Sequence, residues 1–215
     1  MGKKVVISFS GGKDSVLSLH KAVSLGYEPI ALMTTINKNK GDSWFHDISS
    51  DLLKQVSLAI NIPLLLVECS GENYENTFEI ALKNMKNLGA EACIFGDIDI
   101  AHHREWGEIR CKNTGLEAIF PLWQENRETL VKEFIDLGYK AIIKKVNLKN
   151  MNVDFLGKTL SHKLLEEIKA TGSDVCGENG EYHTFVYDGP IFSKEIPLKN
   201  TGDIINENTL VLKSY

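Results

Sequence analysis

The chain has 215 residues, of which 43% are hydrophobic, and a formal net charge of −5. This length and apolar content suffice for a full hydrophobic core without crosslinks. The negative charge argues against a broad nucleic-acid surface, because Lys and Arg contacts to phosphate dominate such binding. With no signal peptide and no apolar run of membrane-spanning length, we expect a cytoplasmic protein that binds neither membranes nor, directly, nucleic acid.

Apolar runs of strand length alternate with segments of helical periodicity along the first half of the chain. Strands are predicted at residues 5–9, 29–36, 64–69, 92–95 and 116–120, and helices at 14–25, 47–60, 73–88 and 101–112. The helix at 73–88 carries an apolar stripe predicted to be core: Tyr74, Phe78, Ala81, Leu82, Met85 and Leu88. Apolar strands alternating with helices are typical of a parallel sheet covered on both faces. Residues 1–123 are therefore predicted to form an α/β domain with a five-stranded, Rossmann-like parallel sheet.

The pattern changes beyond Trp123. Helices are predicted at residues 127–137 and 159–169, a strand at 141–146, and a glycine-rich extended run from Cys176 to Pro190. A smaller C-terminal α+β domain is therefore predicted over residues 124–215.

The most informative motif is Ser10-Gly11-Gly12-Lys13-Asp14-Ser15, which follows an apolar strand and opens a helix. Adjacent glycines permit a sharp turn, so several backbone N–H groups can point at one anion at the helix N-terminus. The two serines add hydroxyl donors and the lysine adds positive charge. The motif predicts a phosphate or pyrophosphate site, and its spacing excludes a Walker A loop and a Gly-x-Gly-x-x-Gly loop. The alternative is a glycine turn with Asp14 or Ser15 as an ordinary helix N-cap.

A second polar motif, Gly96-Asp97-Ile98, follows the fourth predicted strand. Ligands bind at the carboxyl ends of strands in such sheets, so this motif and the first one are expected to serve one site. Asp97 ends a buried strand, where an acid needs a partner such as Mg²⁺ or a polar ligand. An N-cap role for Asp97 or Asp99 is the alternative. Further along, Arg104 and Glu108 have the spacing of a surface ion pair on a helix.

A third cluster contains Glu178, Glu181 and His183 around two glycines that permit a tight turn. A strand from Glu181 onward would place Glu181, His183 and Phe185 on one face. Two carboxylates beside an imidazole can bind an amine, hold a metal or relay a proton. A polar hairpin whose acids face water is the alternative.

The four cysteines form no Cys-x-x-Cys pair, which argues against a zinc knuckle or a redox dithiol. Cys69 and Cys93 lie in apolar strand-like runs and are expected in the core. Cys111 and Cys176 lie in polar contexts without a local Cys–His arrangement, so a structural role is expected for them as well.

Taken together, these motifs resemble the diphthine–ammonia ligase family within the N-type ATP pyrophosphatases, the PP-loop superfamily with its adenine nucleotide alpha-hydrolase-like fold. The resemblance is carried in chain order by Ser10–Ser15, Gly96–Ile98, Trp106 with Glu108, Pro121–Trp123, Leu156-Gly157 and Cys176–Phe185. The first motif specifies only the superfamily, whereas the glycine-rich run is specific to the ligase family.

The resemblance implies an ATP-dependent, AMP-forming carboxylate–ammonia ligase that uses Mg²⁺. ATP would be cleaved between its α and β phosphates to give an acyl-adenylate and pyrophosphate, and ammonia would then attack the activated carbonyl. The implied carboxylate is diphthine on a translation elongation factor or a related substrate, and a homodimer is left open.

The resemblance also assigns roles to individual residues. Nucleotide contacts are expected at Ser8, Ser10, Gly11, Gly12, Lys13, Asp14, Ser15, Met33 and Gly96, with backbone around Leu32-Met33 at the end of the second strand against adenine. Catalytic roles are expected for Lys13, Asp97, Glu178, Glu181 and His183, with Asp97 also on Mg²⁺, the acids attracting ammonium and His183 accepting its proton. Substrate selection would belong to the C-terminal domain, and substrate contacts are expected at Arg104, Trp106, Glu108, Asn179 and Gly180.

Two other classes of protein are alternatives to a ligase. A tRNA-modifying or sulfur-transferring PP-loop enzyme would be expected to show catalytic cysteines and a basic RNA surface, and neither is evident. A non-enzymatic adenine-nucleotide sensor would bind ATP and release no pyrophosphate.

Overall fold

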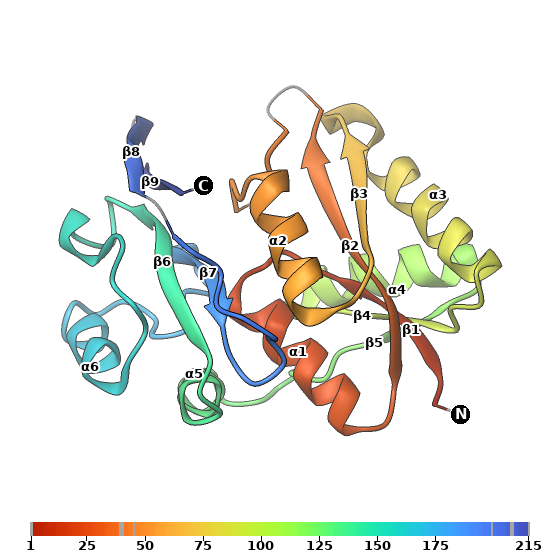
Figure 1. The fold of residues 1–215 in the computed structure, drawn as a ribbon, viewed down its shortest axis with the longest axis horizontal. Coiled ribbons are helices and arrows are strands. Elements are labelled where there is room, and N and C mark those ends of the chain that lie inside the picture. The colour runs from red at the N-terminus through yellow and green to blue at the C-terminus, as the bar shows by residue number, and fades with distance from the viewer. Residues whose placement is uncertain (1, 39–40, 45, 199, 207–208, 215) are drawn as a thin grey trace. The chain divides into compact units, whose positions relative to one another are not determined.

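The protein divides into two compact units (Figure 1). The structure is a computed structural model and describes residues 2–38, 41–44, 46–198, 200–206 and 209–214, the last two ranges as backbone only. One unit comprises Met1–Ser10 and Asp14–Glu125, and the other comprises Gly11–Lys13 and Asn126–Tyr215. The segment Gly11–Lys13 is thus grouped with residues that follow it by more than a hundred positions in the sequence.

The first unit is built on a five-stranded sheet in the order β3-β2-β1-β4-β5, in which every pairing is parallel. Its strands are β1 (Lys4–Ser8), β2 (Glu28–Asn37), β3 (Leu64–Cys69), β4 (Ala92–Ile94) and β5 (Glu117–Ile119). The connecting helices are α1 (Lys13–Ser24), α2 (Ser50–Ile60), α3 (Tyr74–Asn87) and α4 (Ala101–Thr114), with a short 3₁₀ turn, η1 (Gly71–Asn73), before α3. The predicted α/β fold is confirmed.

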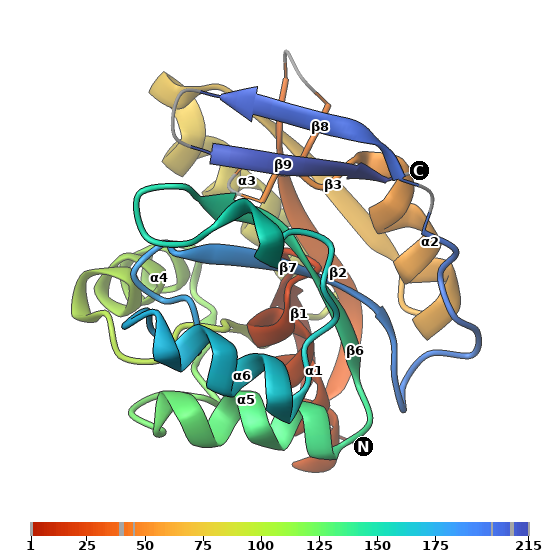
Figure 2. The ribbon, with the colours of Figure 1, turned by 90° about the vertical axis from the view of Figure 1, so that its left-hand side faces the viewer.

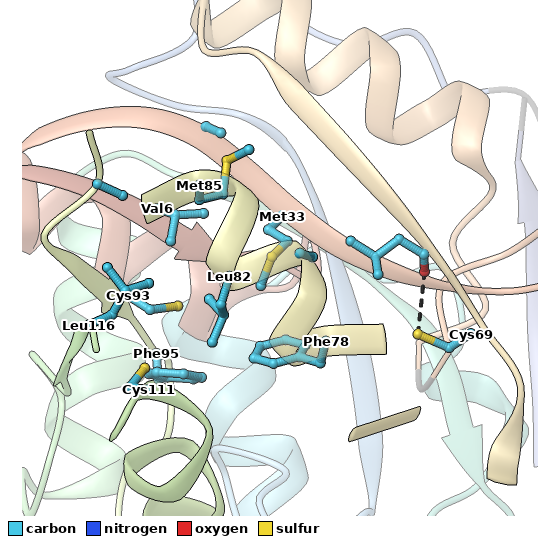
Figure 3. Close-up of a cluster of buried hydrophobic side chains, with 14 residues drawn as sticks. Val6, Met33, Cys69, Phe78, Leu82, Met85, Cys93, Phe95, Cys111 and Leu116 are labelled. Atoms are coloured by element: carbon cyan, nitrogen blue, oxygen red, sulfur yellow. Dashed lines mark hydrogen bonds between the residues drawn. The ribbon is translucent and has the colours of Figure 1, made fainter. Parts of the chain in front are cut away.

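Helices cover both faces of this sheet. Right-handed crossovers place α1 and α2 on one face and α3 and α4 on the other (Figure 1). Beneath α3 and α4 lies a hydrophobic cluster that contains Val6, Phe78, Leu82, Cys93 and Cys111, each at most 2% exposed (Figure 3). This cluster anchors the two helices whose neighbouring loops contribute to the site.

The predicted apolar stripe of α3 is confirmed in its middle, while Tyr74 at its start is only half-buried. Phe78, Ala81, Leu82 and Met85 are buried. Leu88 is 69% exposed, so its assignment to the core is wrong. The reason is that α3 ends one residue earlier and Leu88 becomes its C-cap.

The second unit carries a four-stranded antiparallel sheet in the order β7-β6-β9-β8, together with two helices. The strands are β6 (Lys140–Asn147), β7 (Tyr182–Asp188), β8 (Asn200–Asn206) and β9 (Thr209–Ser214). The helices are α5 (Arg127–Asp136) and α6 (His162–Ala170), and η2 (Val153–Phe155) is a short 3₁₀ turn. The predicted smaller α+β part is confirmed. None of the helices within the described residues is long and apolar enough to cross a membrane.

Two predicted helix starts are wrong because capping residues lie further along the chain. The helix predicted from Asp47 is α2, which starts after Ser49, and the Ser49 side chain accepts a hydrogen bond from a first-turn amide. The helix predicted from Thr159 is α6, where Ser161 caps in the same way. Thr159 instead lies in an isolated β-bridge with Ile142.

Helices α5 and α6 are antiparallel neighbours joined at both ends (Figure 2). Glu128 of α5 pairs with Lys169 of α6 at 2.9 Å, and Asp136 contacts His162 at 2.7 Å. Hydrogen bonds from Lys132 and Lys169 lower the pKa of Glu128 to about 2. Since the folded-state pKa of Glu128 is depressed, its pairs with Lys132 and Lys169 support the fold at neutral pH, and their contribution is lost as the pH falls toward 2.

Candidate functional site

The Ser10–Ser15 loop connects β1 to α1 and makes the sharp turn that its glycines predict. Gly11 has a φ of +80°, a conformation that favours glycine. The hydroxyl oxygens of Ser10 and Ser15 lie 3.2 Å apart, so the structure brings together two of the predicted phosphate ligands. Because α1 begins at Lys13, the alternative of Asp14 or Ser15 as its N-cap is wrong. Of the predicted nucleotide contacts here, Gly11, Gly12, Lys13 and Ser15 are buried, and Ser8, Ser10 and Asp14 are half-buried.

Met33 lies inside β2 rather than at its end. The predicted position is wrong because β2 continues to Asn37. The Met33 side chain lies in the core cluster (Figure 3), and its carbonyl accepts a hydrogen bond from the Phe9 N–H at 2.9 Å. The hydroxyl of Thr34 donates to the Phe9 carbonyl at 2.6 Å. These two bonds tie the residue before Ser10 to β2, and a backbone contact from Met33 to adenine stays a prediction.

The segment after β4 lies directly against the first turn of α1. The Phe95 carbonyl accepts a buried hydrogen bond from the Ser18 hydroxyl at 3.1 Å. A Cβ at Gly96 would lie 3.1 Å from the Asp14 carbonyl carbon and from the Ser15 nitrogen, so only a glycine fits without displacing backbone. Strands β1 and β4 are neighbours at the point where the strand order reverses, which is where such sheets bind ligands. The structure therefore brings together the two predicted motifs, the Ser10–Ser15 loop after β1 and the segment Gly96–Ile98 after β4.

Asp97 is the next residue after this glycine, and its side chain is 27% exposed. Its Oδ1 atom lies 3.4 Å from Nδ1 of His103. The alternative of Asp97 or Asp99 as a helix cap is wrong, because the N-cap of α4 is Ile100. A partly exposed carboxylate is a preferred ligand of Mg²⁺, so the chemistry of the predicted metal contact is present.

Arg104, in the first turns of α4, has a guanidinium group held from several sides. Its Nε atom donates to Oε1 of Glu108 at 2.7 Å, which confirms the predicted ion pair. Its Cζ atom lies 4.7 Å from the ring centroid of Trp123 and 5.4 Å from that of Phe120. Contacts with aromatic rings restrain the plane of the guanidinium group. An arginine fork held in this way suits a planar carboxylate or a phosphate.

Trp106 lies on a different side of α4, since residues two apart do not share a helix face. Its Nε1–H donates to Oε1 of Glu75 at 3.2 Å. Its ring centroid is 4.9 Å from that of Phe78 and 5.9 Å from that of Tyr74. Burial raises the pKa of Tyr74 to about 12, so its phenol stays protonated well into the alkaline range. The structure thus places Trp106 in aromatic packing and does not bring it to the Arg104–Glu108 pair.

All four cysteines are buried, and none forms a disulfide. The predicted core positions of Cys69 and Cys93 are confirmed, and burial raises the pKa of both thiols. Since the thiolate is the reactive form, buried thiols of raised pKa do not suit sulfur transfer. The environments of Cys69 and Cys93 therefore disfavour sulfur transfer at these two thiols.

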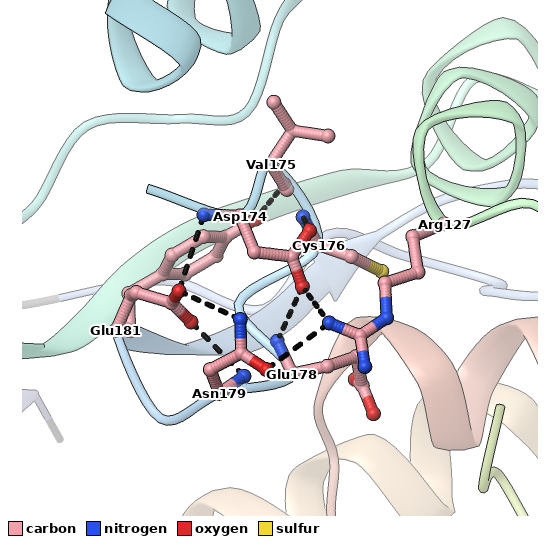
Figure 4. Close-up of polar contacts among 8 residues, drawn as sticks. Arg127, Asp174, Val175, Cys176, Glu178, Asn179 and Glu181 are labelled. Carbon is pink, nitrogen blue, oxygen red and sulfur yellow. Dashed lines mark hydrogen bonds and ion pairs between the residues drawn. The ribbon is translucent and has the colours of Figure 1, made fainter. Parts of the chain in front are cut away.

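In the second unit, the turns at residues 174–181 precede β7 and are organised by two carboxylates (Figure 4). The first is Asp174, which accepts hydrogen bonds from the backbone N–H of Cys176 at 3.0 Å and of Glu178 at 3.1 Å. Nη1 of Arg127 donates to the same carboxylate at 2.6 Å. A residue from α5 thereby fixes the carboxylate around which the loop turns.

Glu181 supplies the second carboxylate, which points into the loop and is 4% exposed (Figure 4). Oε1 accepts from the Asp174 N–H at 3.1 Å and from the Asn179 amide at 3.2 Å, and Oε2 accepts from the Asn179 N–H at 3.0 Å. The prediction that Glu181 shares a strand face with His183 and Phe185 is wrong, because β7 begins one residue later. The Glu181 carboxylate holds the loop together.

The remaining residues of this cluster lie apart from Glu181. Figure 4 shows the side chain of Glu178 leading away from it, so the structure does not bring the two predicted acids together. His183 is half-buried on β7, opposite Lys145 of β6. The tight turn predicted here is confirmed by Gly180, whose φ is +82°. Oδ1 of Asn179 accepts from Arg127 at 3.2 Å, which adds a second link from α5 to the loop.

We expect Glu181→Gln to destabilise the protein by about 2 kcal/mol. Each carboxylate oxygen accepts a backbone hydrogen bond, and glutamine would replace one of these oxygens by an NH₂ group, which leaves one N–H without its acceptor. The measurement is the midpoint of urea unfolding. Glu178→Gln, which removes the same charge from a half-buried side chain of the same loop, is the control and should shift the midpoint little. An unchanged midpoint in Glu181→Gln would contradict the structural role of this carboxylate.

The Gly-Gly-Lys segment of the first loop belongs to the second unit and lies along β7. The Gly11 carbonyl accepts a hydrogen bond from the Val186 N–H at 2.9 Å. The Lys13 N–H donates to Oγ1 of Thr184 at 3.0 Å, and the Lys13 side chain is 4% exposed with Nζ 5.7 Å from the Tyr182 ring centroid. The Lys13 N–H is thus engaged by Thr184, and the prediction that several N–H groups of this loop point at one anion rests on its other amides.

Three residues that organise these loops were not predicted from the sequence: Arg127, Asp174 and Thr184. Arg127 bonds Asp174 across 47 residues of sequence, and Thr184 bonds Lys13 across 171 residues. No periodicity or local motif signals partners at such separations. Two weaker signals were present: Asp174 lies just before the glycine-rich run, and Thr184 lies within it, but neither position indicates a bonding partner.

Comparisons with known proteins cover both units. A family profile described as "Diphthamide synthase N-terminal domain" matches residues 3–118, and one described as "Diphthamide synthase C-terminal domain" matches residues 126–210. The diphthine–ammonia ligase of Mus musculus is 29% identical over 228 residues, covering 94% of this chain and 85% of the mouse protein. The ligase of Bos taurus is 30% identical over 90% of this chain and 82% of its own length. That of Schizosaccharomyces pombe is 31% identical over 91% of this chain and 36% of its own length.

Among solved structures, a protein from Methanocaldococcus jannaschii described as a predicted subunit of tRNA methyltransferase aligns with a TM-score of 0.48 and 18% identity. The alignment covers 90% of this chain and 100% of that chain, and a likeness of this size carries no functional argument. The family profiles and the named relatives confirm the predicted class of enzyme, a ligase. The chain therefore belongs to the diphthamide synthase family.

Proposed function

We propose that this protein is an ATP-dependent ligase that joins ammonia to the carboxylate of diphthine on a translation elongation factor. The names of the relatives, diphthine–ammonia ligases, support this substrate. The observation that carries the ATP chemistry is the edge of the sheet at which the Ser10 and Ser15 hydroxyls meet and Gly96 packs on the first turn of α1. A helix N-terminus flanked by hydroxyl donors favours an oxyanion such as a phosphate.

In the proposed reaction, a carboxylate oxygen of the substrate attacks the α-phosphorus of ATP, and the bond from that phosphorus to the bridging oxygen of pyrophosphate breaks. Ammonia then attacks the acyl carbon and loses a proton, and AMP leaves with the former carboxylate oxygen. The products are an amide, AMP and pyrophosphate. Lys13 would neutralise charge that develops on the departing pyrophosphate, and it would do so most strongly from a buried position.

Mg²⁺ fits this edge, because the Asp97 carboxylate is partly exposed and carboxylate oxygens are ligands that this cation takes. Asp97 would hold it. When bound, the metal would supply further positive charge next to the phosphates.

For the amide-forming half of the reaction, we assign Glu178 to the attraction of ammonium and His183 to acceptance of its proton. Both side chains are half-buried and therefore reachable from solvent. Glu181 acts in this proposal as a positioning residue, because its oxygens are used within the loop. Asn179 and Gly180 would offer their backbone carbonyls to the substrate, because their N–H groups are bonded within the turn.

For the acyl substrate, we assign Arg104, with Glu108 restraining it. The guanidinium fork is restrained by two aromatic rings and one carboxylate, which suits recognition of a carboxylate group. Trp106 would support this region through its aromatic packing.

The proposal is tested by incubating the protein with ATP, Mg²⁺, ammonium and diphthine-bearing elongation factor, and by measuring pyrophosphate, AMP and the amide product. We expect all three in equal amounts, and no amide when ammonium is omitted. Pyrophosphate release with small carboxylates but not with the elongation factor would overturn the proposed substrate. ATP binding without pyrophosphate release under every condition would overturn the ligase chemistry in favour of a nucleotide sensor.

A further inference from the structure

We infer that Thr184 is a positioning residue for Lys13, the phosphate-binding lysine of the proposed function, on which this inference rests. Thr184 lies on β7 and Lys13 opens α1, 171 residues earlier in the chain. The Thr184 hydroxyl sets the backbone of Lys13 and with it the direction in which the ammonium group extends.

The two residues meet through a buried hydrogen bond. Oγ1 of Thr184 accepts from the Lys13 N–H at 3.0 Å, and the residues are 3% and 4% exposed. A second bond runs from the Val186 N–H to the Gly11 carbonyl at 2.9 Å. Thr184 is bonded to Lys13, and Val186, two residues later on β7, is bonded to Gly11, two residues earlier in the loop. The Gly-Gly-Lys segment therefore runs antiparallel to this strand.

Strand β7 stands at the edge of its sheet, since β6 is its only partner strand among the described residues. An edge strand presents backbone groups on its outer side that need partners. One of these groups, the Val186 N–H, is satisfied by Gly11. At the next position, a threonine hydroxyl takes the part that a main-chain carbonyl would take in an ordinary ladder. The side chain of residue 184 therefore supplies an acceptor to the lysine N–H.

The same face of β7 also meets the other end of the lysine. Tyr182 and Thr184 are two residues apart on a strand, so their side chains share a face. The Lys13 ammonium lies 5.7 Å from the centroid of the Tyr182 ring, within the range of a cation–π contact. The Tyr182 hydroxyl in turn donates to the Val175 carbonyl in the loop before β7. Strand β7 thus restrains the lysine at its backbone and at its charge.

Thr184→Val tests the inference, because valine keeps the shape of threonine and removes the acceptor. We expect ATP to bind about tenfold more weakly, which corresponds to one buried N–H left without its partner. Affinity is measured by titration calorimetry with ATP and Mg²⁺. Thr184→Ser, which keeps the hydroxyl, should bind ATP like the parent. Thr159→Val is the matched control, because its hydroxyl contacts the Tyr187 hydroxyl in the same unit and lies outside the proposed site.

The decisive measurement repeats Thr184→Val in a Lys13→Ala background, where the backbone N–H remains and the ammonium is gone. If Thr184 acts through the lysine, the substitution should not weaken ATP binding further in that background. Equal weakening in both backgrounds, or no weakening in either, would overturn the inference. These measurements report the affinity for ATP and not turnover. If the parent protein bound ATP but released no pyrophosphate, the proposed ligase reaction would be wrong, and the effect of Thr184→Val on affinity could still be measured.

Discussion

Lys13→Ala should lower the rate of pyrophosphate release by about 10²- to 10³-fold, the loss typical of removing one group that stabilises developing negative charge. Lys13 is 4% exposed, and a charge acts more strongly where water is excluded. The backbone hydrogen bond from residue 13 to Thr184 does not depend on the side chain, so the loop should keep its path. Alanine also favours the first turn of α1. The expected signature is therefore a large loss of turnover with a nearly unchanged unfolding midpoint.

The control for this variant is Lys21→Ala, which removes the same charge from the last turn of the same helix. Both proteins are assayed for pyrophosphate with ATP, Mg²⁺, ammonium and diphthine-bearing elongation factor, and both are unfolded in urea. Lys21→Ala should retain the parent rate. If Lys13→Ala released pyrophosphate as fast as the parent, the phosphate site assigned to the Ser10–Ser15 loop would be incorrect.

Gly177→Ala should destabilise the protein by about 3 kcal/mol, the sum expected from a strained backbone and an overpacked contact. Gly177 has a φ of +75°, which a residue with a Cβ rarely adopts. A Cβ there would also lie 2.9 Å from the Tyr182 carbonyl oxygen and 3.0 Å from its ring. Backbone cannot move aside as a flexible side chain can, so the turn before β7 must shift. The measurement is the midpoint of urea unfolding.

Gly180→Ala is the matched control for this prediction. Gly180 lies in the same turn with a φ of +82°, but a Cβ there would meet nothing within 4 Å. The Gly180→Ala substitution should lower the free energy of unfolding by only about 1 kcal/mol, the cost of placing a residue with a Cβ at positive φ. Equal shifts of the unfolding midpoint in the two variants would show that contact with Tyr182 has no part in holding the turn.

Much of the first unit could be predicted because its signals are local. Burial of a strand on both faces requires a run of apolar residues, and residues 92–95 were predicted as a strand where β4, all of whose residues are buried, is found. The site at the edge of the sheet followed from topology, since the loops after β1 and β4 must emerge on the same side. The errors were also local: serine caps delayed α2 in this unit and α6 in the second one, and the longer β2 placed Met33 in its interior.

The glycine-rich run shows where such prediction stops. The sequence correctly indicated a tight turn, because glycines with positive φ are required for it. It did not indicate that Glu181 would point into the loop, because the direction of a carboxylate depends on which N–H groups surround it. Those groups are placed by Asp174, whose own orientation depends on Arg127 of α5. The orientation of Glu181 therefore depends on that of Asp174, which depends on the contact with Arg127.

By itself, then, the sequence determined the parallel sheet, the loop at its edge and the family, because hydrophobic periodicity and motif spacing are properties of neighbouring residues. Only the tertiary structure decided that Glu181 supports its loop and that Thr184 holds the backbone of Lys13. A hydrogen bond depends on distances of a few tenths of an ångström and on direction. Between residues 171 apart in the chain, such geometry exists only after the elements that carry them have packed.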